Sequence, residues 1–160
     1  MSTNDNRLKA EILSDTEITM QRSFKAPREL VYRAMTAPDL IPTWWGQRRS
    51  TTIVDKLDAR VGGEWRFIQR GEDGTEYAFR GTFLELDPPG RIVQTFEFEP
   101  MPGHVSTDAL TLSEIDGGTL VRIDSSFTSK EDRDGMLQSG MEGGANETYD
   151  RLEELLATMV

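Results

Sequence analysis

Cysteine is absent from the 160-residue chain, and histidine occurs only once, as His104. Without thiols the chain can form neither disulfides nor thiolate metal sites, and it has no cysteine nucleophile. A zinc site would lack a second imidazole, and a Ser-His-Asp triad would depend on His104 alone. His104 lies in a Pro-rich stretch and is expected to be an exposed side chain. The sequence therefore predicts no metal site and no cofactor.

Basic residues are also scarce, since 18 Lys and Arg stand against 28 Asp and Glu for a net charge of −10. Such a chain repels nucleic-acid backbones and anionic membrane surfaces, so neither is expected as a partner. The excess is concentrated between Lys130 and Glu154, where eight acids accompany three bases. This stretch fits either a solvated helix face or an acidic surface that docks a protein partner.

Long apolar runs are missing as well. No stretch approaches the roughly 18 residues of a membrane span, and the segment from Met1 to Glu11 lacks the apolar core of a signal peptide. The chain is therefore expected to be soluble and cytoplasmic. Residues 1–14 show no sustained period and are predicted to form a flexible tail. The remaining length suits one domain over residues 15–160.

What the sequence does contain is a series of strand signals. A first alternating segment runs from Thr16 to Phe24, and Ala26-Pro27 then starts a short helix that Pro38 ends. A second short helix or turn is expected over Asp39–Trp45. Six further strands are predicted at Thr51–Leu57, Glu64–Gln69, Tyr77–Leu86, Ile92–Phe98, Ser106–Ile115 and Thr119–Phe127. Short Gly-, Pro- and Asp-rich turns separate them, which favours antiparallel neighbours.

The last segment changes to a helical period. Apolar residues recur at three- and four-residue steps from Leu137 to Leu155, which predicts one amphipathic helix of about 25 residues. Gly140, Gly143 and Gly144 interrupt this pattern, either for close packing on the sheet or to leave room for a cavity. The predicted fold class is therefore α+β, with a curved seven-stranded antiparallel sheet around a long C-terminal helix and two short helices after the first strand.

Several short motifs occur along the chain in an order that is typical of a known superfamily. They are Arg22-Ser23-Phe24-Lys25-Ala26-Pro27 through Tyr32, Trp44-Trp45-Gly46, Asp58 to Trp65, Asp73-Gly74, Gly81 to Val93, and a closing helix over Gly140 to Leu155. Together they resemble the SRPBCC (START-like, Bet v 1-like) superfamily. More narrowly, they resemble the bacterial homologues of the activator of heat-shock-protein-90 ATPase. The resemblance extends from about Thr16 to Leu156, although family members often carry Gly-Trp where this chain has Gly143-Gly144.

The resemblance implies a helix-grip fold with a cavity between the sheet and the long helix. Members of the superfamily bind lipids, polyketides, hormones or aromatic compounds there, and some catalyse cyclisation or hydrolysis. Others are known only as small domains near stress or regulatory genes. Fold likeness by itself does not choose among these activities.

The side chains expected to line such a cavity follow from strand parity. The candidate ligand-binding residues are Trp45, Trp65, Phe67, Tyr77, Phe79, Phe83, Gln94, Phe96, Ser125, Met141, Gly144 and Thr148. A shift of one residue in register would reverse the face on which a strand's side chains lie. The alternative is a filled core without a usable cavity. Of the two adjacent tryptophans, one ring is expected to cap the core and the other to line the cavity mouth.

Few residues are placed for catalysis. The four acids with a chance of facing inward, Glu64, Glu76, Glu85 and Asp124, are expected in solvent, and no catalytic residue is predicted. Asp58 and Arg60 are expected to brace a turn. The adjacent bases Arg48 and Arg49 fit either a solvated loop or a contact with an anionic head group. Gly62-Gly63 leads into a strand rather than a helix, which argues against a nucleotide site.

Three functions are therefore open. The favoured one is a module that binds a small apolar or aromatic molecule between sheet and helix. The second is a cyclase- or hydrolase-type enzyme that would use Glu76, Tyr77 or Asp124 in the same cavity. The third is a domain that docks a protein partner, as a co-chaperone does. Exposed strand edges would also permit a homodimer, although nothing in the residues requires one.

Overall fold

The computed structural model describes residues 8–159. The strands are β1 (Glu11–Ser14), β2 (Glu17–Phe24), β3 (Thr51–Leu57), β4 (Glu64–Arg70), β5 (Glu76–Asp87), β6 (Arg91–Phe98), β7 (Ser106–Ile115) and β8 (Gly118–Ser126). The helices are α1 (Arg28–Thr36), α2 (Ile41–Trp44), α3 (Lys130–Gln138) and α4 (Met141–Met159). Among these residues, no helix has both the length and the apolar character that a membrane crossing requires.

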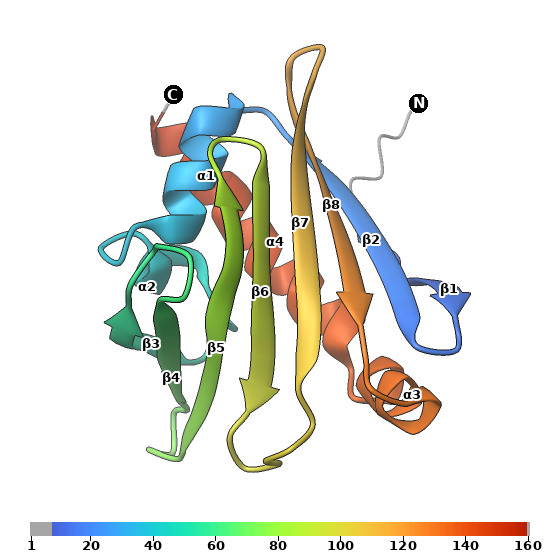
Figure 1. Ribbon diagram of the computed structural model, residues 1–160. Coiled ribbons are helices and arrows are strands. Elements are labelled where there is room, and N and C mark those ends of the chain that lie inside the picture. Colours follow the sequence, from blue (N-terminus) through green and yellow to red (C-terminus); the bar gives the residue numbers. More distant parts are fainter. Residues whose placement is uncertain (1–7, 160) are drawn as a thin grey trace.

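All strands belong to one antiparallel sheet in the order β1-β2-β8-β7-β6-β5-β4-β3. Helix α4 runs diagonally behind this sheet, with α1 and α2 near one end and α3 beside the other (Figure 1). The predicted α+β helix-grip fold is confirmed. The predicted strands match the observed ones closely, because apolar and polar residues alternate along them and turn residues separate them.

The sheet has eight strands rather than the predicted seven, because residues 11–14 form the edge strand β1 against β2. The segment before β1 is also held in place. Leu8 is 1% exposed, and its backbone N–H donates to Asn146 of α4 at 2.7 Å. The prediction of a flexible tail is therefore wrong for residues 8–14, while residues 1–7 lie outside the described residues.

The predicted single C-terminal helix is two helices, α3 and α4, with a break at Ser139 and Gly140. Gly140 has a φ of +83°, a left-handed conformation that glycine adopts without a steric penalty. At the start of α3 the hydroxyl of Ser129 accepts a hydrogen bond from the Asp132 N–H at 3.0 Å, which caps the helix. The chain therefore turns between the two helices, and only α4 lies along the sheet.

The space between the sheet and α4 is filled at one end. Leu152 and Leu156 of α4 are almost completely buried there, together with Val31 of α1 and Ile41 of α2. The N-terminal half of α4 instead carries Gly143, Gly144 and Ala145, which supply little side-chain volume. The helix thus packs tightly near its C-terminus and leaves space near its N-terminus.

Candidate functional site: a cavity between the sheet and helix α4

A cavity of about 1000 Å³ lies under the N-terminal half of α4. Its walls come from the concave face of strands β4 to β8 and from one side of α4. Residues of the β4–β5 and β6–β7 loops and of α3 also line it. The expected alternative of a filled core is therefore wrong for this half of the molecule.

Every candidate ligand-binding residue lies at the wall of this one cavity. The strands and the α2–β3 connection contribute Trp45, Trp65, Phe67, Tyr77, Phe79, Phe83, Gln94, Phe96 and Ser125, and helix α4 contributes Met141, Gly144 and Thr148. Their contact with a ligand stays a prediction. Tyr77 is 47% exposed, and the β4–β5 loop that precedes it also lines the cavity.

Aromatic rings form a continuous wall. The ring centroid of Trp45 lies 5.1 Å from that of Phe67 and 5.3 Å from that of Phe79, both in edge-to-face geometry. Phe79 in turn lies 5.6 Å from Phe96 and 5.0 Å from Phe98. These separations are the ones that aromatic pairs prefer, so the rings support one another and present a preformed apolar surface.

Both adjacent tryptophans line the cavity, but they have different neighbours. Trp44 is 4% exposed, and its indole N–H donates to the backbone carbonyl of Ala34 at 2.8 Å. This ring therefore closes the core between α1 and α4. Trp45, which follows directly in the chain, lies against the cavity rings of Phe67 and Phe79.

A polar row crosses the concave face between the apolar walls. Gln94 of β6 is directly opposite Asp108 of β7, and Asp108 is directly opposite Ser125 of β8. Directly opposed residues in antiparallel strands project their side chains from the same face. All three side chains line the cavity, so an amide, a carboxyl and a hydroxyl stand side by side on its floor.

Asp108 was not among the predicted site residues. Burial raises the pKa of its carboxyl to about 6, and a hydrogen bond with the Ser125 side chain opposes part of this rise. Tyr149 of α4 also lines the cavity. Burial first, and the nearby Asp108 second, raise the pKa of Tyr149 above its ordinary value, so the phenol keeps its proton at neutral pH.

The missed residues carry signals in the sequence. Asp108 precedes Leu110 and Leu112 by two and four residues, and these leucines are buried, so strand parity puts Asp108 on their face. Tyr149 follows Met141 and Ala145 at four-residue steps on one side of α4. Continuing the strand alternation from Leu110 back to Asp108, and the four-residue helical step from Ala145 on to Tyr149, would have found both residues.

The glycines of α4 do not serve close packing, which was one of the two expected reasons for them. A Cβ atom added at Gly143 or Gly144 would have no neighbour within 4 Å. Gly144 lines the cavity, whereas Gly143 is exposed. The helix therefore leaves open space beside Gly144.

At the mouth of the cavity, His104 is 55% exposed as expected, but its Nδ1 lies 2.8 Å from Oδ1 of Asp132. The hydrogen bonds from His104, first, and from Thr128 hold the pKa of the Asp132 carboxyl below its usual range. This contact joins the β6–β7 loop to α3. Both residues line the cavity, so the pair bridges two sides of its opening.

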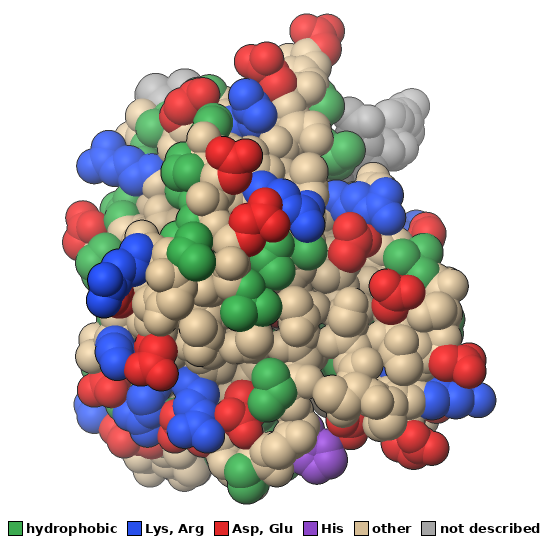
Figure 2. Space-filling model, in the orientation of Figure 1, with side chains coloured by type: hydrophobic (Ala, Val, Ile, Leu, Met, Phe, Trp, Pro, Cys, Tyr) green, Lys and Arg blue, Asp and Glu red, His purple; other side chains and the backbone are tan. Residues whose placement is uncertain are grey.

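The other charged candidates lie away from the cavity. The expected acids Glu64, Glu76, Glu85 and Asp124 pair with Lys56, Arg70, Arg91 and Arg122, in that order. Figure 2 shows acidic and basic side chains mixed over this outer side of the sheet. The prediction that these four acids face solvent is confirmed, and the enzyme hypothesis loses Glu76 and Asp124 as cavity groups.

Asp58, Arg60 and Arg48, which the sequence singled out in loops, have structural contacts. Arg60 Nε lies 2.7 Å from Asp58 Oδ2, as expected of a pair that braces the turn before β4. The guanidinium of Arg48 pairs with Glu154 of α4, and the backbone N–H of Arg48 donates to Glu147. Arg48 therefore ties its loop to α4 rather than facing an anionic head group.

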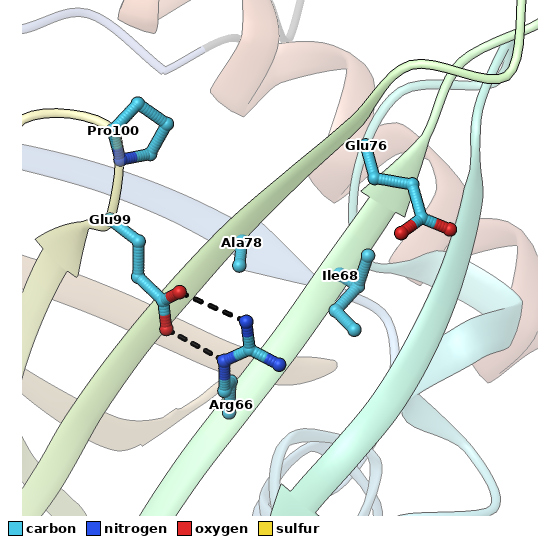
Figure 3. A pocket seen from close by; sticks show the side chains of 6 residues that line it. All are labelled: Arg66, Ile68, Glu76, Ala78, Glu99 and Pro100. Carbon is cyan, nitrogen blue, oxygen red and sulfur yellow. Dashed lines mark hydrogen bonds and ion pairs between the residues drawn. The ribbon is translucent and has the colours of Figure 1, made fainter.

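A second, smaller hollow of about 340 Å³ lies on the outer face over β4 and β5. Arg66 spans it, and its guanidinium donates to both carboxylate oxygens of Glu99 at 2.7 and 2.9 Å (Figure 3). Arg66 also donates to Asp55 at 3.3 Å. The charged residues of this hollow already have partners, since Glu76 pairs with Arg70, so the hollow offers little to a ligand.

The described residues contain no group of three or more His, Cys, Asp or Glu side chains placed to hold a metal ion. The family model described as Activator of Hsp90 ATPase homolog 1-like protein matches residues 25–157. The chain belongs to this family. The resemblance noted in the sequence is thereby confirmed. None of the curated proteins matches the chain at a significant level.

Solved structures of bacterial proteins share the fold of this family member. A crystal structure from Rhodobacter sphaeroides superimposes with a TM-score of 0.89 at 25% identity, over 95% of this chain and 99% of that one. An AHSA1 protein from Silicibacter pomeroyi has a TM-score of 0.76 at 19% identity, over 90% and 99% of the two chains. DynU16, from the dynemicin biosynthetic locus, has a TM-score of 0.70 at 21% identity, over 91% of this chain and 48% of that one.

Proposed function

We propose that this protein is a binding module that encloses a small apolar or aromatic molecule between its sheet and helix α4. The observation that carries the proposal is the cavity of about 1000 Å³ with its wall of aromatic rings. Ligand pockets typically have volumes of 300 to 1000 Å³ and combine apolar walls with a few polar groups. DynU16, a protein from a biosynthetic locus, is a fold neighbour compatible with this role.

The physical driving force would be burial of apolar surface. Rings such as Trp45 and Phe79 pack against the core on one side and line the cavity on the other. Each square ångström of apolar surface removed from water contributes about 25 cal/mol. Because neighbouring rings already hold one another in place, a flat apolar guest would order few side chains on entering, which preserves affinity.

Native mass spectrometry of the purified protein tests this proposal first. An excess over the 18.1 kDa chain mass that organic extraction removes is expected for an occupied cavity. Fragmentation of the released compound would then identify its chemical class. A bare chain mass, together with no uptake of naphthalene-based probes, would contradict the proposal.

A matched pair of variants tests the location. Gly144→Trp places an indole at the cavity wall, where an added Cβ meets open space, and should reduce ligand uptake at least tenfold. Gly143→Trp adds the same ring one residue earlier, at an exposed position, and should leave uptake nearly unchanged. Equal uptake by both variants would exclude the cavity as the binding site.

A second candidate function is acid–base catalysis in the same cavity, and Asp108 is the observation that favours it. A carboxyl with a pKa of about 6 is suited to transfer protons near neutral pH. Incubating the protein with the compound recovered from it would reveal a mass change if a reaction occurs. That change should disappear in Asp108→Asn, and an unaltered compound would argue for binding alone.

Docking of a chaperone or other protein partner, a homodimer, a cytoplasmic location and a role in the stress response remain predictions. The same holds for the choice between a lipid and a polyketide as ligand. Docking through the acidic region between Lys130 and Glu154 would weaken as salt is added. A pull-down at low ionic strength that recovers no stable partner would count against it.

A further inference from the structure

We propose that the ligand is an amphiphilic amine, with an aromatic body against the rings and a protonated nitrogen against Asp108. This inference rests on the proposed binding function and names the chemical class of its ligand. It is carried by the position of Asp108 in the floor of the cavity and by the side chains on either side of it.

The surroundings of Asp108 provide no positive charge. Among residues 8–159, no ion pair within 4.0 Å of a carboxylate oxygen involves Asp108, although thirteen other pairs are formed. Arg22, a buried cation on β2, forms ion pairs with two acids of α4 instead. Its guanidinium lies 2.7 Å from Asp150 and 3.5 Å from Glu153. Asp108 is partly buried, and a carboxylate that is partly removed from water without a cation is less favourable than one in water. The cavity therefore has room for a positive partner beside it.

The polar row matches the hydrogen-bonding capacity of a primary ammonium group. Such a group has three N–H donors and no acceptor. Gln94, Asp108 and Ser125 are direct cross-strand neighbours on the concave face, and adjacent strands lie about 4.8 Å apart. An amide oxygen, a carboxylate and a hydroxyl oxygen are thus available side by side, one acceptor for each donor.

The rest of the cavity favours the same class of ligand. The rings of Trp45, Phe79 and Phe96 line the walls, and the faces of aromatic rings attract cations as well as stack on apolar surfaces. The chain carries a net charge of −10, which raises the local concentration of cations and lowers that of anions. A carboxylate-bearing guest would meet Asp108 as a like charge.

A series of three probes with one aromatic body isolates the head group. Naphthylmethylamine, naphthalenemethanol and naphthoic acid differ in charge while their ring systems are the same. Calorimetric titration of the full-length protein at pH 7.5 should show at least tenfold tighter binding of the amine than of the alcohol. The acid should bind most weakly.

Two variants provide the control, because each removes one negative charge, one from the cavity face of the sheet and one from its outer face. Asp108→Asn keeps the shape of the side chain but removes its charge, and should reduce the preference for amine over alcohol to threefold or less. Asp124 lies on the outer face opposite Ala109 and pairs with Arg122 at 3.0 Å. Asp124→Asn lowers the net negative charge equally and should keep the full preference. Circular dichroism would confirm that both variants fold.

The outcomes separate this inference from the proposed function. Equal binding of amine and alcohol by the unmodified protein would overturn the amine assignment and leave the binding module standing. Failure of all three probes to bind would overturn both. An amine preference that survives Asp108→Asn would also overturn the inference. If Asp108→Asn does not fold, the probe series with the unmodified protein decides the question alone.

Discussion

The side-chain amide of Asn146 binds both backbone polar groups of Leu8. Its oxygen accepts from the Leu8 N–H at 2.7 Å, and its nitrogen donates to the Leu8 carbonyl at 3.0 Å. The backbone N–H of Ala10 donates to Glu142, one turn earlier on α4, at 2.7 Å. The Asn146 side chain thus pairs with Leu8, 138 positions earlier, through one N–H and one carbonyl, as a neighbouring strand would. The segment before β1 is therefore part of the fold.

Replacing Asn146 with Ala is expected to lower the free energy of unfolding by about 2–4 kcal/mol. Three hydrogen bonds would be lost, two with Leu8 and one to the Glu142 carbonyl. The buried N–H and carbonyl of Leu8 would be left without these partners. Urea denaturation measures this loss. Hydrogen exchange at the Leu8 amide should accelerate more than exchange in β7. Unchanged protection at Leu8 would show that other contacts hold the segment.

Asp108 is expected to make the stability of the protein depend on pH. The pKa of its carboxyl is about 6 in the folded state against an ordinary value of 3.8. The folded chain therefore binds more protons than the unfolded chain between these values, and stability decreases as pH rises from about 4 to about 6. By linkage, the loss amounts to roughly 3 kcal/mol at most.

Comparison with Asp108→Asn isolates this contribution. At pH 8 the variant should be more stable than the unmodified protein by up to roughly 3 kcal/mol, whereas near pH 4 the two should be nearly equal. Urea titrations at both pH values measure the difference, and Asp124→Asn on the outer face is the control. A variant that is less stable at pH 8 would contradict the assigned burial of the carboxyl.

Gly140, in the break before α4, and Gly144, within α4, should respond in opposite directions to alanine. Gly144→Ala should raise the free energy of unfolding by about 0.5–1 kcal/mol, because an added Cβ meets open space and alanine favours a helix interior. Gly140→Ala should lower it by about 1–2 kcal/mol, because its φ of +83° is strained for a residue with a Cβ. Thermal unfolding of both variants checks the signs, and equal signs would contradict the described break between α3 and α4.

The contact between His104 and Asp132 should control the opening of the cavity more than overall stability. His104→Ala removes the link between the β6–β7 loop and α3, so hydrogen exchange in α3 and probe release should become faster. Global stability should change little because both side chains lie near solvent. Thr128→Ala is a matched control, since it removes a 2.9 Å bond to the same carboxylate but leaves the loop linked. Equal release rates in both variants would argue against a role for the link.

Local patterns predicted most of the fold because each strand shows its own alternation. Thr51–Leu57 and Ser106–Ile115 are predicted and observed with identical bounds. The segment before Ser14 has no such pattern, and its order depends on Asn146, far away in the chain. The helical spacing of apolar residues did not predict the break at Gly140, because this spacing continues across the break.

The part of the candidate site that lies on strands could be predicted from the alternation of side chains between the two faces of the sheet. The eight candidates on strands β4, β5, β6 and β8 reach one cavity because side chains in antiparallel strands keep their face over the whole sheet. The three on α4 follow from the helical period. Asp108 shares this parity with Leu110 but was not singled out. Its significance appears only when Gln94 and Ser125 are paired beside it, which is a matter of register between strands that are distant in sequence.

The sequence by itself determined the α+β class, the antiparallel strands and the face on which the rings lie, because these follow from local periods of two and 3.6 residues and from turn residues. Only the tertiary structure decided that the interior is full beside Leu152 and hollow beside Gly144. A cavity is the difference between the volume that a sheet and a helix enclose and the volume of the side chains they supply. That difference depends on how α4 lies across the sheet, which no local pattern encodes.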